Sequence, residues 1–143
     1  IYGEHLHEKS RIYEGIPGVL DKLQAEGIKM AVLSNKPHLL TQRVAAYYLS
    51  PWTFTHILGQ REEIPRKPDP AAAFEIAEGM GLDPANILFV GDSNNDILTA
   101  RAAGMVPLGV YWGYGRLRTE AVEGDYRILE EPGEIVPFIK KQA

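Results

Sequence analysis

Short apolar runs recur along the chain and predict buried β-strands. Residues 28–33 (IKMAVL) and 87–91 (ILFVG) are the clearest of these runs, because both are apolar almost throughout and of strand length. Weaker candidates are residues 56–59, 108–112 and 126–129.

Amphipathic helical patterns lie between these runs. The first begins at Pro17, places Val19, Leu20 and Leu23 on one face and ends at Gly27. Further helices are expected from Pro37, burying Leu39, Leu40 and Val44; from Pro70 to Gly81; through Ile97, Ala100 and Ala103 to Gly104; and over residues 134–141. Strands that alternate with helices imply βαβ units, right-handed crossovers and a parallel sheet, so the predicted fold class is α/β.

Composition narrows the functional classes. With 143 residues, 45% apolar and 24% charged, the chain suits a globular domain. The net charge of −4 and the lack of a basic run argue against nucleic acid as a partner. No apolar stretch reaches the roughly 20 residues that a membrane span needs. Cysteine is absent, which excludes disulfides and zinc–thiolate sites and fits a cytoplasmic location.

Ser34 and Asn35 form the first polar cluster, directly after the run at 28–33. Ligands of open α/β sheets bind beyond the carboxyl ends of the strands. This position, just before the helix expected from Pro37, would aim a hydroxyl and backbone N–H groups at an anion. Taken alone, a simple N-cap role for Ser34 explains the position better.

Lys67 is the centre of the second cluster, Arg66-Lys67-Pro68-Asp69-Pro70. The two prolines stiffen this loop and fix the direction of the lysine. A lysine held in this way can neutralise a phosphoryl group as a compact point charge. A solvated lysine in a turn before a helix is the common alternative.

The third cluster, Gly91-Asp92-Ser93-Asn94-Asn95-Asp96, follows the best strand candidate and is the most specific. Asp92 and Asp96 lie four residues apart on a turn that enters a helix, so one carboxylate can bind a metal ion while the other orients it. Hard oxygen ligands suit Mg²⁺. A helix cap at Asp92 and a first-turn charge at Asp96 are the alternatives, but they give no reason for both beside Gly91.

Together the three clusters resemble the haloacid dehalogenase (HAD) superfamily of phosphohydrolases. Leu33-Ser34-Asn35 matches its second motif, Lys67-Pro68-Asp69-Pro70 its third, and the GDxxxD of residues 91–96 its fourth. The stretch GVYWGYG at 109–115 resembles the phosphoglycolate phosphatase branch. The resemblance implies a three-layer, doubly wound, mostly parallel Rossmann-like sheet.

The resemblance also implies an activity and roles for the site residues. It implies a Mg²⁺-dependent phosphatase that acts on a small phosphomonoester, with 2-phosphoglycolate preferred, through an aspartyl-phosphate. Asp92 and Asp96 would serve the metal, Lys67 would offset the charge of the phosphoryl group, and Ser34 with Asn35 would bind that group. The oligomeric state is not readable from the sequence.

The first motif of the superfamily, DxDx[T/V], which supplies the nucleophile, does not occur in this chain. The aspartates are Asp21, Asp69, Asp83, Asp92, Asp96 and Asp125, and no Asp-x-Asp is among them. We therefore expect a chain truncated at the N-terminus and inactive alone. Residues 1–15 would be the tail of a helical cap domain with its return linker, and residues 16–143 the core domain without its first strand, which normally lies between the strand before Ser34 and the strand ending at Gly91.

Three alternatives remain at this point. A haloacid dehalogenase shares the layout but needs no metal, and a sugar phosphomutase is a further transferase of the same superfamily. A module that binds phosphate esters without turnover would belong to a different functional class.

Overall fold

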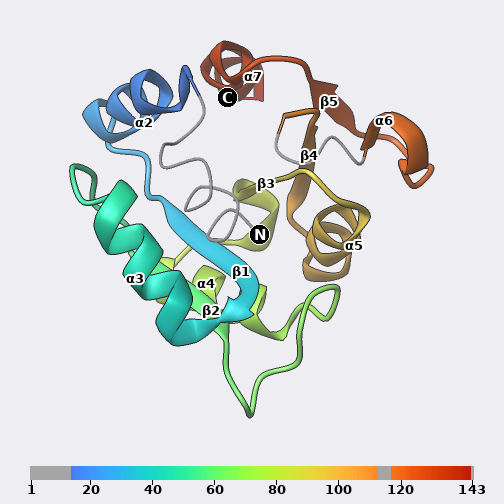
Figure 1. The fold of residues 1–143 in the computed structure, drawn as a ribbon. Helices are drawn as coiled ribbons and strands as arrows, with labels where there is room; N and C mark the ends of the chain where they lie inside the picture. The colour runs from blue at the N-terminus through green and yellow to red at the C-terminus, as the bar shows by residue number, and fades with distance from the viewer. Residues whose placement is uncertain (1–13, 113–116, 143) are drawn as a thin grey trace. The chain divides into compact units, whose positions relative to one another are not determined.

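The computed structural model describes residues 14–112 and 117–142. Helices and strands alternate along most of the chain (Figure 1). Their order is α2 (Ile16–Ala25), β1 (Ala31–Pro37), α3 (His38–Tyr48), β2 (His56–Gln60), α4 (Ala71–Met80), η1 (Pro84–Asn86), β3 (Leu88–Gly91), α5 (Asn94–Ala103), β4 (Val106–Val110), α6 (Leu117–Glu120), β5 (Arg127–Leu129), η2 (Pro132–Glu134) and α7 (Ile135–Gln142).

The chain divides into two compact units, each described here by itself. The first unit comprises Ile1–Arg61 and Glu131–Ala143, and the second comprises Glu62–Glu130. In the first, β1 and β2 pair in parallel, with Val32 opposite Ile57, and α3 packs along both strands (Figure 1). The helix α2 packs against η2 and α7 in the same unit.

Close backbone approach explains how α3 fits against β2. A Cβ atom on Gly59 would lie only 2.6 Å from both the Cα of His38 and the carbonyl oxygen of Lys36. The Gly59 N–H also donates to Nδ1 of His38 at 3.0 Å. Glycine at this position therefore lets the start of α3 lie directly on the end of β2.

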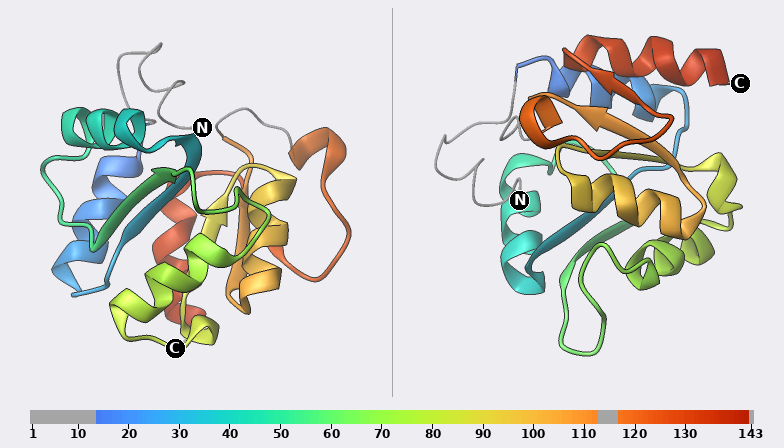
Figure 2. Two further views of the ribbon diagram at one scale, coloured as in Figure 1. Left: turned by 90° about the horizontal axis from the view of Figure 1, so that it is seen from below. Right: turned by 90° about the vertical axis from the view of Figure 1, so that its right-hand side faces the viewer.

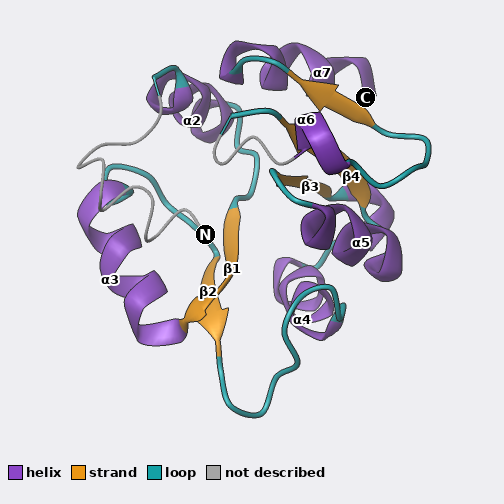
Figure 3. Ribbon diagram, turned by 45° about the vertical axis from the view of Figure 1, so that its right-hand side comes forward, coloured by secondary structure: helices purple, strands orange, loops and turns teal. Residues whose placement is uncertain are grey.

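The second unit is built on a three-stranded parallel sheet in the order β3-β4-β5 (Figure 3). The helix α5 packs on β3 and β4, and α4 packs on α5 (Figure 2). The centre of this unit is almost fully excluded from water. Its most buried large side chains are Ile97, Leu108, Val110 and Leu129.

The predicted fold class and the parallel pairing are confirmed, and most helix ends lie where proline and glycine predict them. Pro70 is the N-cap of α4 and Gly81, with φ of 70°, is its C-cap. Gly104, with φ of 76°, ends α5. Proline lacks the N–H that a first turn leaves unused, and glycine accepts the left-handed conformation that ends a helix.

Some local predictions are wrong. The strand expected at residues 108–112 is β4, two residues earlier at Val106–Val110. The first strand begins at Ala31 rather than at residue 28, because the Ile28 N–H donates to the Leu23 carbonyl and keeps this residue in the turn that ends α2. Leu39 and Leu40 are exposed, since α3 turns Thr41, Val44 and Ala45 inward instead.

The strands described form two hydrogen-bonded sheets, in which β1 and β3 are both terminal strands. The cap-domain assignment falls largely on residues 1–13, and part of the GVYWGYG stretch falls on residues 113–116; both ranges lie outside the described residues. Among the helices that the structure describes, none has the length and apolar character needed to cross a membrane.

Candidate active site

Asp92 and Asp96 occupy the turn between β3 and α5. Ser93 is the N-cap of α5: its hydroxyl oxygen accepts the Asp96 N–H at 3.4 Å, and its own N–H donates to Asp96 Oδ2 at 3.3 Å. This reciprocal capping box fixes the first turn of the helix. Asp92 lies just before the cap and is completely buried. The alternative in which Asp92 is the helix cap is therefore wrong.

Gly91 is required by the position of the Asp96 side chain. Any Cβ atom on Gly91 would overlap Cβ, Cγ and Oδ2 of Asp96. The Asp92 N–H donates to Asp96 Oδ2 at 3.1 Å, so the carboxylate folds back over the end of β3. The glycine and the second aspartate of GDxxxD are thus two parts of one close contact.

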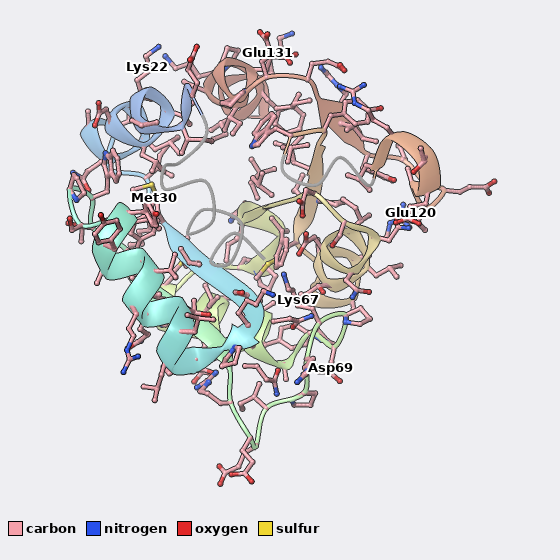
Figure 4. The ribbon with its side chains drawn as sticks, viewed as in Figure 1. Lys22, Met30, Lys67, Asp69, Glu120 and Glu131 are labelled. Carbon is pink, nitrogen blue, oxygen red and sulfur yellow. The ribbon has the colours of Figure 1, made fainter. Side chains whose placement is uncertain are left out.

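Lys67 is the counter-charge of this turn. It lies in the loop before α4, with exposed Asp69 two residues further on (Figure 4). Its ammonium lies 2.5 Å from Asp96 Oδ1, and the two side chains are only 6% and 4% exposed. The same nitrogen lies 6.0 Å from the centre of the Phe89 ring on β3. A solvated lysine in a surface turn is excluded by this burial.

The charges in this cluster favour a cation. With both carboxylates ionised, Asp92 and Asp96 carry two negative charges, and Lys67 offsets one of them. Two carboxylates against one ammonium leave an excess of negative charge, which a small hard cation would offset. Mg²⁺ binds proteins through one or two carboxylates and keeps several waters. Asp92 fits this requirement, while no group of three or more metal-binding side chains occurs within residues 14–112 and 117–142.

Ser34 and Asn35 lie in the first unit, within β1 rather than after it. Ser34 is 7% exposed, and its hydroxyl oxygen accepts the Lys36 N–H at 3.0 Å. The pairing register of β1 with β2 shifts between Leu33 and Pro37, so the chain is irregular at this point. Because Pro37 is the N-cap of α3, a simple capping role for Ser34 is excluded.

The structure brings together Lys67 and Asp96, which are 29 residues apart, and places Asp92 on the same turn. Two residues that the sequence analysis passed over also act here. Ser93 closes the capping box, and the pattern S-x-x-D before an apolar run predicts this arrangement. Asn94 bonds to a distant loop, and no local pattern records that contact.

Buried carboxylates and a buried lysine lie at the carboxyl end of β3, in a parallel sheet. This arrangement is typical of α/β proteins that bind ligands beyond the carboxyl ends of their strands. Residues 2–104 match the haloacid dehalogenase-like hydrolases, and the chain belongs to this family.

Individual relatives are similar over most of this chain. It is 38% identical over 113 residues to the phosphoglycolate phosphatase of Haemophilus influenzae (strain 86-028NP), which covers 79% of this chain and 50% of that protein. It is 34% identical over 136 residues to the phosphoglycolate phosphatase of Pseudomonas fluorescens (strain Pf0-1), covering 92% and 48%. The chain therefore spans about half the length of the curated relatives it matches.

A solved structure shares the fold over nearly the whole chain. The crystal structure of a predicted phosphoglycolate phosphatase from Haemophilus somnus 129pt matches with a TM-score of 0.78 and 29% identity. The match covers 96% of this chain and 63% of that chain.

Proposed function

We propose that the whole protein is a magnesium-dependent phosphatase that hydrolyses a small phosphomonoester through an aspartyl-phosphate. The observation that supports this most strongly is the buried Asp92 at the carboxyl end of β3, on the turn whose Asp96 pairs with Lys67. The turn offers an oxygen ligand for a cation, and the loop before α4 brings a positive charge for a phosphate.

Each residue of the site has a proposed role. Asp92 would hold Mg²⁺, which supplies charge neutralisation at the phosphate when it is bound. Asp96 fixes the turn and Lys67 through its two oxygens. Lys67, which Asp96 holds in place, would offset the charge of the phosphoryl group. Ser34 and Asn35 are proposed to bind the phosphoryl group.

The nucleophile is proposed to come from a part of the protein that this sequence does not contain. No Asp-x-Asp occurs in the 143 residues, and the chain spans about half of its curated relatives. Residues 16–143 would then be a core domain that lacks its first strand, and residues 1–15 the end of a cap domain. In this reaction an aspartate would attack phosphorus, and the P–O bond of the ester would break to release the substrate's alcohol. Water would then hydrolyse the aspartyl-phosphate to regenerate the aspartate and release inorganic phosphate.

The preferred substrate is 2-phosphoglycolate. Both of the curated relatives described above carry the name phosphoglycolate phosphatase. A phosphate-release screen of the full-length protein over small phosphomonoesters, with and without Mg²⁺, tests this choice. Efficient release from sugar phosphates with 2-phosphoglycolate untouched would reject the substrate but keep the reaction. Tight binding of esters without turnover would reject the reaction and favour a binding module.

Asp92→Asn in the full-length protein tests the metal assignment. We expect it to abolish magnesium-dependent phosphate release and the rise in melting temperature that Mg²⁺ gives the unaltered protein, because the amide removes the anionic ligand. Asp83→Asn is the matched control, since Asp83 is an exposed N-cap of η1 in the same unit and asparagine also caps. Full activity in Asp92→Asn would show that the metal assignment is wrong.

A further inference from the structure

Asn94 joins the Asp92–Asp96 turn to a segment that follows α6. Its side-chain Nδ2 donates to the Glu120 carbonyl, and its Oδ1 accepts the Val122 N–H at 2.7 Å. Both partners are backbone groups, so the Asn94 side chain satisfies one carbonyl and one N–H of residues 120–122, as a paired strand would in a sheet. The contact spans 26 to 28 residues of sequence.

Arg101, seven residues further along α5, fixes the other end of this 120–126 segment. Its guanidinium donates to the Glu123 carbonyl at 2.7 Å and lies 5.2 Å from the centre of the Tyr126 ring. The Tyr126 hydroxyl in turn donates to the Val122 carbonyl at 2.6 Å. Gly124 has φ of 141°, and a Cβ atom there would overlap the guanidinium. The 120–126 segment therefore lies along one face of α5 with contacts at both ends (Figure 2).

The same segment anchors α6, which precedes it directly, beside the carboxyl end of β4. Leu117 is buried, and its Cδ1 would lie 2.8 Å from a Cβ atom on Gly109. Arg118 lies 4.2 Å from the centre of the Tyr111 ring and pairs with Glu130 at 3.2 Å. Figures 1 and 3 show α6 close to α5.

Asp92 and Tyr111 lie at the same end of one sheet, the carboxyl end of its strands. In the parallel pair β3–β4, Gly91 is the register partner of Gly109. Asp92 and Tyr111 both follow this paired stretch at its carboxyl end, where ligands of such sheets bind. Tyr111 and Arg118 therefore lie near the carboxyl end of the strands, where Asp92 also lies. Asn94 binds the 120–126 segment that follows α6.

We propose that Asn94 is a positioning residue, which aligns α6 and the Tyr111–Arg118 pair with the turn that carries Asp92. This inference rests on the proposed phosphatase function for its effect on substrate, but the alignment itself is independent of that function. The Asn94 side chain takes no part in the capping box or the Lys67–Asp96 pair, so both should remain when Asn94 is changed, and metal binding should persist. What is lost is the fixed placement of α6 at the border of the site.

Hydrogen exchange of the full-length protein tests the alignment directly. In Asn94→Ala the Val122 amide should exchange about tenfold faster, because two hydrogen bonds that oppose local opening are gone. Asn95→Ala, on the same turn but with an exposed side chain, is the matched control and should leave this amide within about twofold. Equal protection of Val122 in the unaltered protein and in Asn94→Ala would overturn the proposal.

Kinetics with 2-phosphoglycolate, or with the best ester from the screen, test the positioning role. Asn94→Ala should raise KM about tenfold and leave kcat and the Mg²⁺ requirement within about threefold. A displaced α6 should weaken the binding of substrate and transition state equally, and such a loss appears in KM alone. Asn94→Asp keeps the oxygen that accepts the Val122 N–H and should be intermediate. A fall in kcat with unchanged KM would overturn the positioning role. A full-length protein without any phosphatase activity would refute the proposed function, whereas the exchange result would still decide the alignment.

Discussion

Asp96 is the carboxylate that holds its turn together through contacts with several protein groups. Asp96 Oδ1 accepts the Lys67 ammonium, and Oδ2 accepts N–H groups of Asp92 and Ser93 together with the Ser93 hydroxyl at 3.0 Å. A carboxylate with this many donors acts as an organiser of protein groups. Asp96 thus has a structural task within the turn, and the proposed contact with the cation is assigned to Asp92.

A double-mutant cycle on Lys67 and Asp96 tests how strongly the pair holds the turn. Asp96→Asn should lower the free energy of unfolding of the full-length protein by about 3 kcal/mol, because the charge of Lys67 loses its buried carboxylate. Lys67→Met should cost a similar amount. The double variant should cost less than the sum by at least about 1 kcal/mol, measured by urea unfolding.

The control for this cycle is an exposed ion pair. Lys140 lies 3.9 Å from Glu26, and their side chains are 65% and 45% exposed. Glu26→Gln should therefore change the free energy of unfolding by less than about 1 kcal/mol. If the costs of the Lys67 and Asp96 substitutions added without any coupling, the pair would not be what stabilises the turn.

At the scale of elements, α3 shows that a helix can bury a polar residue where leucine was expected. Thr41 is 6% exposed, and its hydroxyl donates to the Pro37 carbonyl at 3.1 Å, with the Lys36 carbonyl 3.3 Å away. The hydroxyl thereby satisfies a carbonyl at the junction of β1 and α3. Leu39, which the pattern assigned to the core, is 71% exposed.

Thr41→Val tests the contribution of this hydroxyl to the first unit. Valine keeps the shape of threonine but removes the donor, so we expect a loss of about 1 kcal/mol in the free energy of unfolding. Thr41→Ser keeps the hydroxyl and removes only a methyl group, and it separates the hydrogen bond from packing. A Thr41→Val protein as stable as the unaltered one would show that the hydroxyl contributes nothing to this junction.

The sequence predicted those elements whose ends depend on local chemistry. Pro70, Gly81 and Gly104 mark helix ends through backbone conformations that neighbouring residues cannot easily change. The face of α3 was misjudged because periodicity counts apolar residues and cannot foresee that Thr41 finds a carbonyl. The start of β1 was misjudged because a hydrogen bond to Leu23 keeps Ile28 in the preceding turn.

The sequence named Lys67, Asp92 and Asp96 as candidate site residues, but it did not predict the contacts that these residues make. The order of Lys67 and the GDxxxD turn along the chain indicated phosphohydrolase chemistry. The 2.5 Å pairing of Lys67 with Asp96 depends on the tertiary fold, which the spacing does not reveal. The bonds of Asn94 to residues 120 and 122 are tertiary for the same reason. Spacing in sequence does not encode which distant backbone group an amide will reach.

At the scale of the whole molecule, the arrangement of strands bears on the proposal that a part of the protein lies outside this sequence. Among the strands that the structure describes, β1 pairs only with β2 and β3 pairs only with β4. Each therefore presents one edge without a described partner strand, and exposed edges of this kind template association with other chains. Val90 on β3 is 38% exposed, so this strand also presents apolar surface to solvent.

Residues 1–143 expressed alone should therefore self-associate, and they should release no phosphate from any ester that the full-length protein hydrolyses. The first effect follows from the strand edges. The second follows from the absent Asp-x-Asp, since removing a nucleophile from a cooperating catalytic set can cost about 10⁶ in kcat. Light scattering across a concentration series and phosphate release with Mg²⁺ measure the two effects, with the full-length protein as the control. A monomeric 143-residue chain that turns over phosphomonoesters would show that the nucleophile lies within this sequence, and the proposed division of the site would then be wrong.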